Sequence, residues 1–147
     1  MRFDRLAEDY LRRARSRLID AKSAFDRGDH PDAVLYCQEC VEFSIKACLR
    51  LVGVEYPREH DVGGVLIDSA DLLPEWLRGH VDKMAEISGE LALLRGPSVY
   101  GEERRGIPPS ELFTEADGKR ALERAEVVFE KCKRFLEWFK TKGSSPS

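Results

Sequence analysis

Apolar residues recur every three or four positions along most of the chain, as they do on one face of a helix. The first such stretch runs from Phe3 to about Phe25, and the second runs from about Ala33 to Val52. Between them, "DRGDHPDAV" offers a glycine to end one helix, and an aspartate and a proline to begin the next. A connection this short predicts an antiparallel helical hairpin.

The same periodicity predicts further helices in the second half of the chain. A short one spans about Val65–Leu72, a long one spans about Glu75–Leu94, and the last runs from Glu115 or Asp117 to about Lys140. In "LLRGPSVYGEERRG" a glycine and a proline follow Arg95, and they predict the end of the long helix there. Residues 96–115 then show no periodicity, and loops of this length commonly carry function or partner contacts.

Four amphipathic helices without strand-like alternation predict an all-α protein. We expect an antiparallel up-and-down four-helix bundle with an additional short helix. The chain of 147 residues is long enough for one core but not for two. We therefore expect a single bundle over residues 1–142 and a flexible polar tail over residues 143–147.

The charge balance limits the classes of partner. A net charge of −3 gives no general attraction for nucleic acid, so any such site must come from a local basic cluster. The arginines at positions 12, 13, 15 and 17 flank the apolar stripe of the first helix and are interpreted as a solvated face that pairs with acids. No apolar run is long enough to span a bilayer and no signal peptide is evident, so we expect a cytoplasmic protein without membrane contact.

The four cysteines, Cys37, Cys40, Cys48 and Cys132, are expected to be reduced and buried. "CQEC" has the spacing of a metal or redox pair, but it lies in the middle of a helix and has no second pair to complete a metal site. We therefore expect no metal and no cofactor.

Two polar pairs precede the short helix. Glu42 and Lys46 lie one helical turn apart, and this spacing predicts an ordinary ion pair on the helix surface. Asp61 is placed to cap the short helix, and His60 beside it belongs to the residue type that titrates near neutral pH. Capping and packing are the preferred interpretation of both, ahead of catalysis.

The stretch "YLRRARSRLIDAKSAFDRGDHPDAVLYCQECVEFSIKACLRLVGVEYPREHDVGGVL" resembles the opening half of HEPN domains, the higher eukaryotes and prokaryotes nucleotide-binding family. The later helices and the Arg95–Tyr100 turn also fall in the expected order, so the resemblance covers nearly the whole chain. It implies an up-and-down bundle of four or five helices that commonly dimerises. The matching positions are Ala7, Tyr10, Leu11, Ala14, Leu18, Ala21, Gly28, Ala33, Gln38, Glu39, Glu42, Lys46, Ala47, Leu49, Gly53, His60, Asp61 and Leu66.

The resemblance also implies a site. In many HEPN proteins an arginine near the end of the third long helix, followed after a few residues by a histidine, cleaves RNA without a metal in a cleft between two subunits. Arginine suits the charge of the transition state and imidazole suits the proton transfers. Arg95 matches the arginine, but no histidine follows it and Tyr100 stands in that region. This form is similar to the turn in members associated with minimal nucleotidyltransferases, and a phenol is a poor proton shuttle at neutral pH.

The candidate site residues are therefore Arg95 and Tyr100, for catalysis or phosphate binding, with Arg104, Arg105 and His60 for phosphate binding. The competing interpretation is structural: Arg95 bonds helix-end carbonyls and Tyr100 packs the loop against the bundle. An excess of aromatic residues, among them Trp76 and Trp138, also favours a homodimer.

Three functions remain open. The first is a dimeric partner of a separately encoded minimal nucleotidyltransferase, in a toxin–antitoxin-like pair, that binds nucleotide or RNA phosphate with little or no catalysis. The second is a metal-independent ribonuclease toxin that uses Arg95 with Tyr100 or His60. The third is an assembly module without enzymatic activity.

Overall fold

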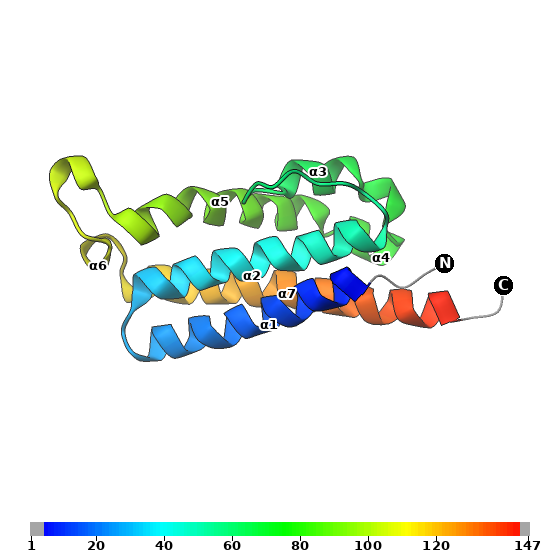
Figure 1. Ribbon diagram of the computed structural model, residues 1–147, viewed down its shortest axis with the longest axis horizontal. Helices are drawn as coiled ribbons and strands as arrows, with labels where there is room; N and C mark the ends of the chain where they lie inside the picture. The colour runs from blue at the N-terminus through cyan, green and yellow to red at the C-terminus, as the bar shows by residue number, and fades with distance from the viewer. Residues whose placement is uncertain (1–4, 145–147) are drawn as a thin grey trace.

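The computed structural model describes residues 5–144, and the described chain is helical almost throughout (Figure 1). The all-α prediction is confirmed: within these residues the β-structure is limited to one isolated bridge between Glu102 and Ile107. The α-helices are α1 (Arg5–Asp26), α2 (His30–Leu51), α3 (Gly63–Asp68), α4 (Glu75–Arg78), α5 (Val81–Tyr100), α6 (Pro109–Leu112) and α7 (Glu115–Ser144), and the 3₁₀ turns are η1 (Ala70–Leu72) and η2 (Glu103–Arg105).

The four long helices run up, down, up and down along the long axis of the molecule, so that α1 begins and α7 ends at the same end (Figure 1). Helix α2 is the central one, because it packs against α1, α5 and α7. The predicted hairpin between α1 and α2 is confirmed. Asp29 caps α2 by accepting a hydrogen bond from the backbone N–H of Asp32, and Pro31 lies in the first turn.

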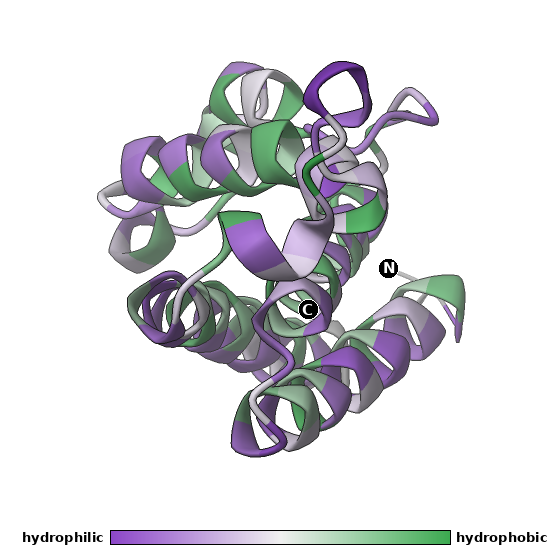
Figure 2. Cartoon of the chain, turned by 90° about the vertical axis from the view of Figure 1, so that its left-hand side faces the viewer, coloured by the Kyte–Doolittle hydropathy of each residue, from purple (hydrophilic) through white to green (hydrophobic). Residues whose placement is uncertain are grey.

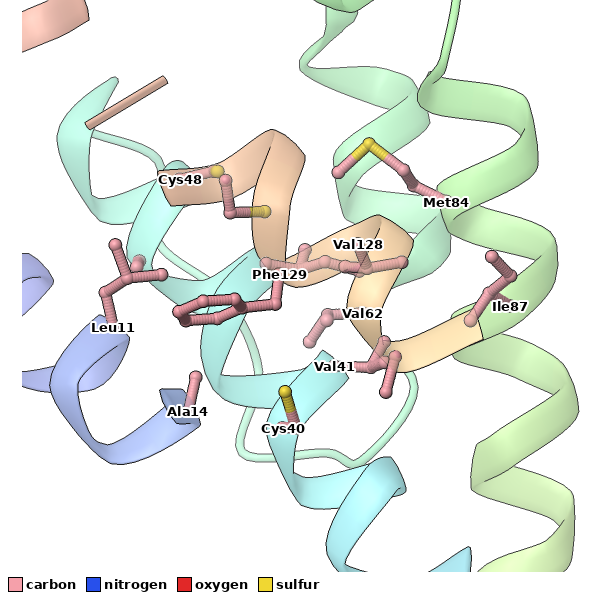
Figure 3. Packing of buried hydrophobic residues seen from close by; sticks show 14 of the residues in the cluster. Leu11, Ala14, Cys40, Val41, Cys48, Val62, Met84, Ile87, Val128 and Phe129 are labelled. Atoms are coloured by element: carbon pink, nitrogen blue, oxygen red, sulfur yellow. The ribbon is translucent and has the colours of Figure 1, made fainter. Parts of the chain in front are cut away.

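Hydrophilic and hydrophobic residues alternate around each long helix, as amphipathic packing requires (Figure 2). The core takes Leu11 from α1, Val41 from α2, Ile87 from α5 and Phe129 from α7, all of them buried (Figure 3). Fully burying one large apolar side chain stabilises the fold by about 1.5–3 kcal/mol, so this shared core holds the four helices together.

The cysteines are free and buried, as expected. Cys40 and Cys48 lie among the apolar side chains of the core (Figure 3). Burial raises the pKa of Cys40 to about 12 and also raises the pKa of Cys37. The thiols of "CQEC" therefore stay protonated and pack as small apolar groups.

The basic face of α1 follows the prediction at Arg12, whereas Arg13 and Arg17 also contact the Phe43 ring. Arg12 pairs with Asp9 at 3.0 Å on the exposed surface, and the Arg13 guanidinium lies 4.5 Å from the centre of the Phe43 ring.

Among the helices of residues 5–144, none combines the length and the apolar character needed to cross a membrane.

The prediction of one helix over 75–94 is wrong at both ends. At its start, α4 ends at Arg78, and α5 begins only at Val81. The Arg78 guanidinium donates a hydrogen bond to the carbonyl of Leu73, and Leu77 is fully buried. This short turn therefore directs Leu77 into the core before the chain restarts as α5.

At its end, the helix does not stop after Arg95: Gly96 and Pro97 lie inside α5, which continues to Tyr100. A proline so near a C-terminus removes one N–H without breaking the last turn, since the N–H of Gly101 still reaches the carbonyl of Pro97 at 2.9 Å. The helix ends at Gly101, whose φ of 70° suits glycine and where a Cβ would collide with the carbonyl oxygen of Ile107. The expected loop is thus shorter, and it contains η2 and α6.

Candidate functional site

Arg95 is held by side chains of the central helix rather than by helix-end carbonyls. Its Nη1 donates to Oε1 of Gln38 at 2.7 Å and lies 3.3 Å from Oε2 of Glu39. The second oxygen of Glu39 accepts from Nε of Arg17 at 3.1 Å, so one carboxylate lies between two guanidinium groups. These two guanidinium groups and one carboxylate together carry a net positive charge.

Gln38 connects Arg95 to a second polar group, Glu42, one turn further along α2. Oε1 of Glu42 accepts from Nε2 of Gln38 at 2.9 Å and from Nδ1 of His60 at 2.8 Å, and Oε2 accepts from Nζ of Lys46 at 2.7 Å. Burial by itself would raise the pKa of Glu42, but the hydrogen bonds from Lys46, Gln38 and His60 together outweigh it, and the pKa lies below its ordinary value. Glu42 is therefore an anion at neutral pH.

The predicted ion pair between Glu42 and Lys46 is confirmed, but its predicted place on the surface is wrong. Both side chains are less than a tenth exposed. The four-residue spacing of Glu42 and Lys46 predicts their ion pair, whereas the burial of the pair follows from the central position of α2 among three other helices.

His60 lies just before α3 with its side chain about half exposed. Because Glu42 is ionised, its carboxylate holds the proton on Nδ1 and fixes the orientation of the ring. Nε2 then remains as the nitrogen that can accept a proton. Val62, and not Asp61, occupies the N-cap position of α3, but Asp61 still holds the start of this helix: its Oδ1 accepts from the backbone N–H of Gly63 and from the hydroxyl of Ser88, both at 2.9 Å.

A hollow of about 400 Å³ adjoins Arg95. Because α5 continues past Pro97, residues of its last turn line this hollow together with one residue from the loop before α3. Tyr100 is 66% exposed, and nothing lies within 4 Å of where a side chain at Gly96 would begin, so the hollow is open to solvent. It is lined by His60, Ala92, Arg95, Gly96, Val99 and Tyr100.

The fold thus brings together three of the five candidate residues, namely Arg95, Tyr100 and His60. Arg104 and Arg105 are exposed in η2 and do not line the hollow, and Arg105 pairs with Glu102 at 3.0 Å. The expected phosphate-binding surface therefore divides into a built hollow and a separate basic turn.

Gln38 and Glu42 are the functional candidates that the sequence analysis missed as site residues. The available signal was the spacing of Gln38, Glu42 and Lys46, four residues apart along one face of α2. That face shows its importance only once the helix is known to be central. Among residues 5–144, no group of three or more His, Cys, Asp or Glu side chains is placed to hold a metal ion.

A family model described as the HEPN domain matches residues 7–135, which include every residue of this site. The chain belongs to the HEPN family. The resemblance seen in the sequence is therefore confirmed, together with the bundle that it implied.

Known relatives of this HEPN protein agree. A protein of Methanocaldococcus jannaschii named "Putative toxin MJ1304" is 31% identical over 137 residues, which cover 89% of this chain and 88% of the relative. The crystal structure of ST0689, described as an archaeal HEPN homologue, superposes with a TM-score of 0.58 at 25% identity, covering 95% of this chain and 98% of ST0689. TT1696 from Thermus thermophilus has the same fold, with a TM-score of 0.69 at 23% identity, covering 87% of this chain and 96% of TT1696.

Proposed function

We propose that this HEPN protein binds a phosphate group of RNA or of a nucleotide in the hollow beside Arg95. The observation that carries this proposal is that the Arg95 guanidinium uses only part of its hydrogen-bonding capacity within the chain. Both bonds of Arg95 use Nη1, and among the described residues nothing else bonds to the group. A planar guanidinium that is fixed on one edge and free on the other suits the oxygens of a phosphate.

The other residues of the hollow complement this role. Tyr100 presents an exposed ring on which a base can stack, and the imidazole of His60 lines the hollow from the loop before α3. Arg17 neutralises part of the charge on Glu39, which reduces the repulsion that this carboxylate would exert on a phosphate.

The protein acts as a homodimer in this proposal. The aromatic residues that favoured a dimer in the sequence mostly pack within the chain, since Phe139 is buried and Trp76 lies under the Arg134 guanidinium. The support comes instead from Leu93, which is 80% exposed on α5, and from Val99 and Tyr100 beside the hollow. A symmetric contact over this apolar face would double the hollow across the axis.

The partner in this proposal is a separately encoded minimal nucleotidyltransferase, and the pair acts as a cytoplasmic toxin–antitoxin-like system. Two observations support it. The turn "RGPSVY" has the form seen in members associated with such enzymes, and a relative that spans nearly the same length carries the name "Putative toxin MJ1304".

A second function, metal-independent ribonuclease activity, is favoured by the contact between Glu42 and His60. Nε2 of His60 would accept the proton of a ribose 2′-hydroxyl, whose oxygen attacks the adjacent phosphorus while Arg95 stabilises the added charge. The bond from phosphorus to the 5′-oxygen breaks, that oxygen takes a proton from water, and protonated His60 returns its proton to the solvent. The products are a 2′,3′-cyclic phosphate and a 5′-hydroxyl end.

Fluorescence anisotropy with a labelled single-stranded RNA and with labelled ATP tests the binding proposal. Arg95→Ala should weaken binding about thirtyfold, equivalent to about 2 kcal/mol for a lost charged hydrogen bond. Arg105→Ala serves as the matched control and should leave affinity nearly unchanged, because Arg105 lies outside the hollow. Absence of binding to both probes at low salt would refute the proposal.

Incubation of RNA with the protein separates the two functions. Cyclic phosphate ends that appear with the wild-type protein and disappear with His60→Ala would establish the ribonuclease. RNA that binds through Arg95 yet stays intact would leave binding as the function.

A further inference from the structure

A second hollow, of about 440 Å³, lies at the end of α2 and shares no lining residue with the hollow beside Arg95. Its walls come from α1, from the last turns of α2 and from the segment that follows. Lys46, Arg50 and Arg58 contribute three cationic side chains to the lining, against one carboxylate from Glu55. Tyr10 and Tyr56 form the aromatic part of the wall.

These side chains are already arranged by contacts within the protein. Nζ of Lys46 is held by Glu42 and lies 5.6 Å from the centre of the Tyr56 ring. Tyr10 meets the same ring edge to face, at 6.1 Å between centroids. A ligand would therefore meet a largely preformed wall, which lowers the cost of ordering side chains on binding.

Tyr56 adds a hydroxyl that stays protonated. Burial, followed by the neighbouring Tyr10 hydroxyl, raises the pKa of Tyr56 to about 12. The hydroxyl therefore stays protonated across the physiological pH range. Arg50 interacts with the same hydroxyl and so ties it to the cationic part of the wall.

We propose that this second hollow binds the terminal phosphate group of a phosphorylated ligand. A phosphomonoester carries close to two negative charges near neutral pH and three acceptor oxygens. The guanidinium groups of Arg50 and Arg58 supply matching charge and donors, while Lys46, whose charge is balanced by Glu42, lines the same wall. The volume lies within the range of small-molecule sites, so the hollow holds a terminal phosphate and the unit next to it.

This inference goes beyond the proposed function, because it concerns a different surface with different residues. Two sources can supply such a group: a free phosphorylated metabolite, or the 5′ end of an RNA chain. Both present the same dianionic phosphate to Arg50 and Arg58.

Isothermal titration calorimetry with inorganic diphosphate tests the site on the whole protein at low salt. Because the hollow beside Arg95 is also proposed to receive phosphate, the titrations use the Arg95→Ala protein as background, in which we expect one saturable site per chain. Arg58→Ala should weaken binding about tenfold through loss of one charged contact. Tyr56→Phe, which removes the hydroxyl but keeps the ring, should weaken it several-fold. Both changes lie in the segment beyond α2, so circular dichroism should show an intact fold.

Two control variants separate this site from the rest of the molecule. Arg120→Ala removes an exposed arginine on α7 that pairs with Glu90 and should leave diphosphate affinity unchanged. Arg95→Ala by itself should leave the affinity of this second hollow unchanged, while strongly weakening RNA binding if the proposed function holds. Failure of one proposal is thus visible independently of the other.

The source of the phosphate is tested with two short RNAs that differ only at the 5′ end. Tighter binding of the 5′-phosphorylated RNA, lost in Arg58→Ala, would support the site with an RNA end as its ligand. Equal binding of both RNAs, together with saturable diphosphate binding, would support it with a small metabolite as its ligand. No saturable diphosphate binding, or equal weakening by Arg58→Ala and Arg120→Ala, would overturn the proposal.

Discussion

The polar row of α2 and the basic turn η2 both carry charge, but they differ in how that charge is held. Gln38, Glu42 and Lys46, which make up the row, are buried and bonded to one another. Arg104 and Arg105 lie exposed in a short turn, and Arg105 forms a surface ion pair with Glu102. Polar residues on a buried face fix the orientation of the groups they bond, whereas arginines exposed in a loop do not, and for this reason the proposed site is built on the polar row.

The largest effect is expected from breaking the polar row. Glu42→Ala would leave Lys46 as a buried cation without its carboxylate, and should lower the free energy of unfolding by about 3–5 kcal/mol. Urea denaturation followed by circular dichroism measures this change. A loss below about 1 kcal/mol would mean that the row contributes no more than a surface pair.

Lowering the pH should remove the stabilising contribution of Glu42. The folded pKa of Glu42 lies below its ordinary value of 4.5, so its contribution to stability is fully present above that pH. The contribution is lost as pH falls through the lower, folded value. Glu42→Gln should therefore flatten the acid side of the stability profile, measured by urea unfolding from neutral pH down through this acid range. If the free energy of unfolding of Glu42→Gln fell with pH as steeply as that of the wild-type protein, the hydrogen bonds assigned to the Glu42 carboxylate would be contradicted.

An intermediate effect is expected at Gly101, which joins α5 to the basic turn. Gly101→Ala places a Cβ against the carbonyl oxygen of Ile107 at a φ of 70° and should cost about 2 kcal/mol or more. Gly96→Ala is the matched control, because its Cβ meets open space inside a helix and should stabilise it by up to about 1 kcal/mol. Thermal unfolding of the two variants distinguishes them, and equal melting temperatures would contradict this account of the end of α5.

The smallest effect is expected in the basic turn. Arg105→Ala removes one exposed ion pair and should change the free energy of unfolding by less than about 0.5 kcal/mol. Urea denaturation beside Glu42→Ala provides the comparison. A loss close to that of Glu42→Ala would show that η2 is as integral to the fold as the polar row.

The helices were predictable because their apolar positions repeat, and the family followed from the residues between Ala7 and Leu66. The end of α5 was not predictable from "RGP", because a proline in the last turn costs little when Gly101 provides the true stop. Residues 145–147 of the expected tail lie outside the described residues. The role of Gln38 and Glu42 depended on the burial of α2, and that burial arises from tertiary packing.

The measurement that most directly tests the central claim is an NMR titration of the isotopically labelled protein with a short single-stranded RNA. We predict saturable shifts of the backbone amides of Gly96, Val99 and Tyr100, with little change at Arg104 and Arg105. Shifts confined to Arg104 and Arg105, or none at the residues around Arg95, would contradict the claim that the hollow at the end of α5 receives a phosphate.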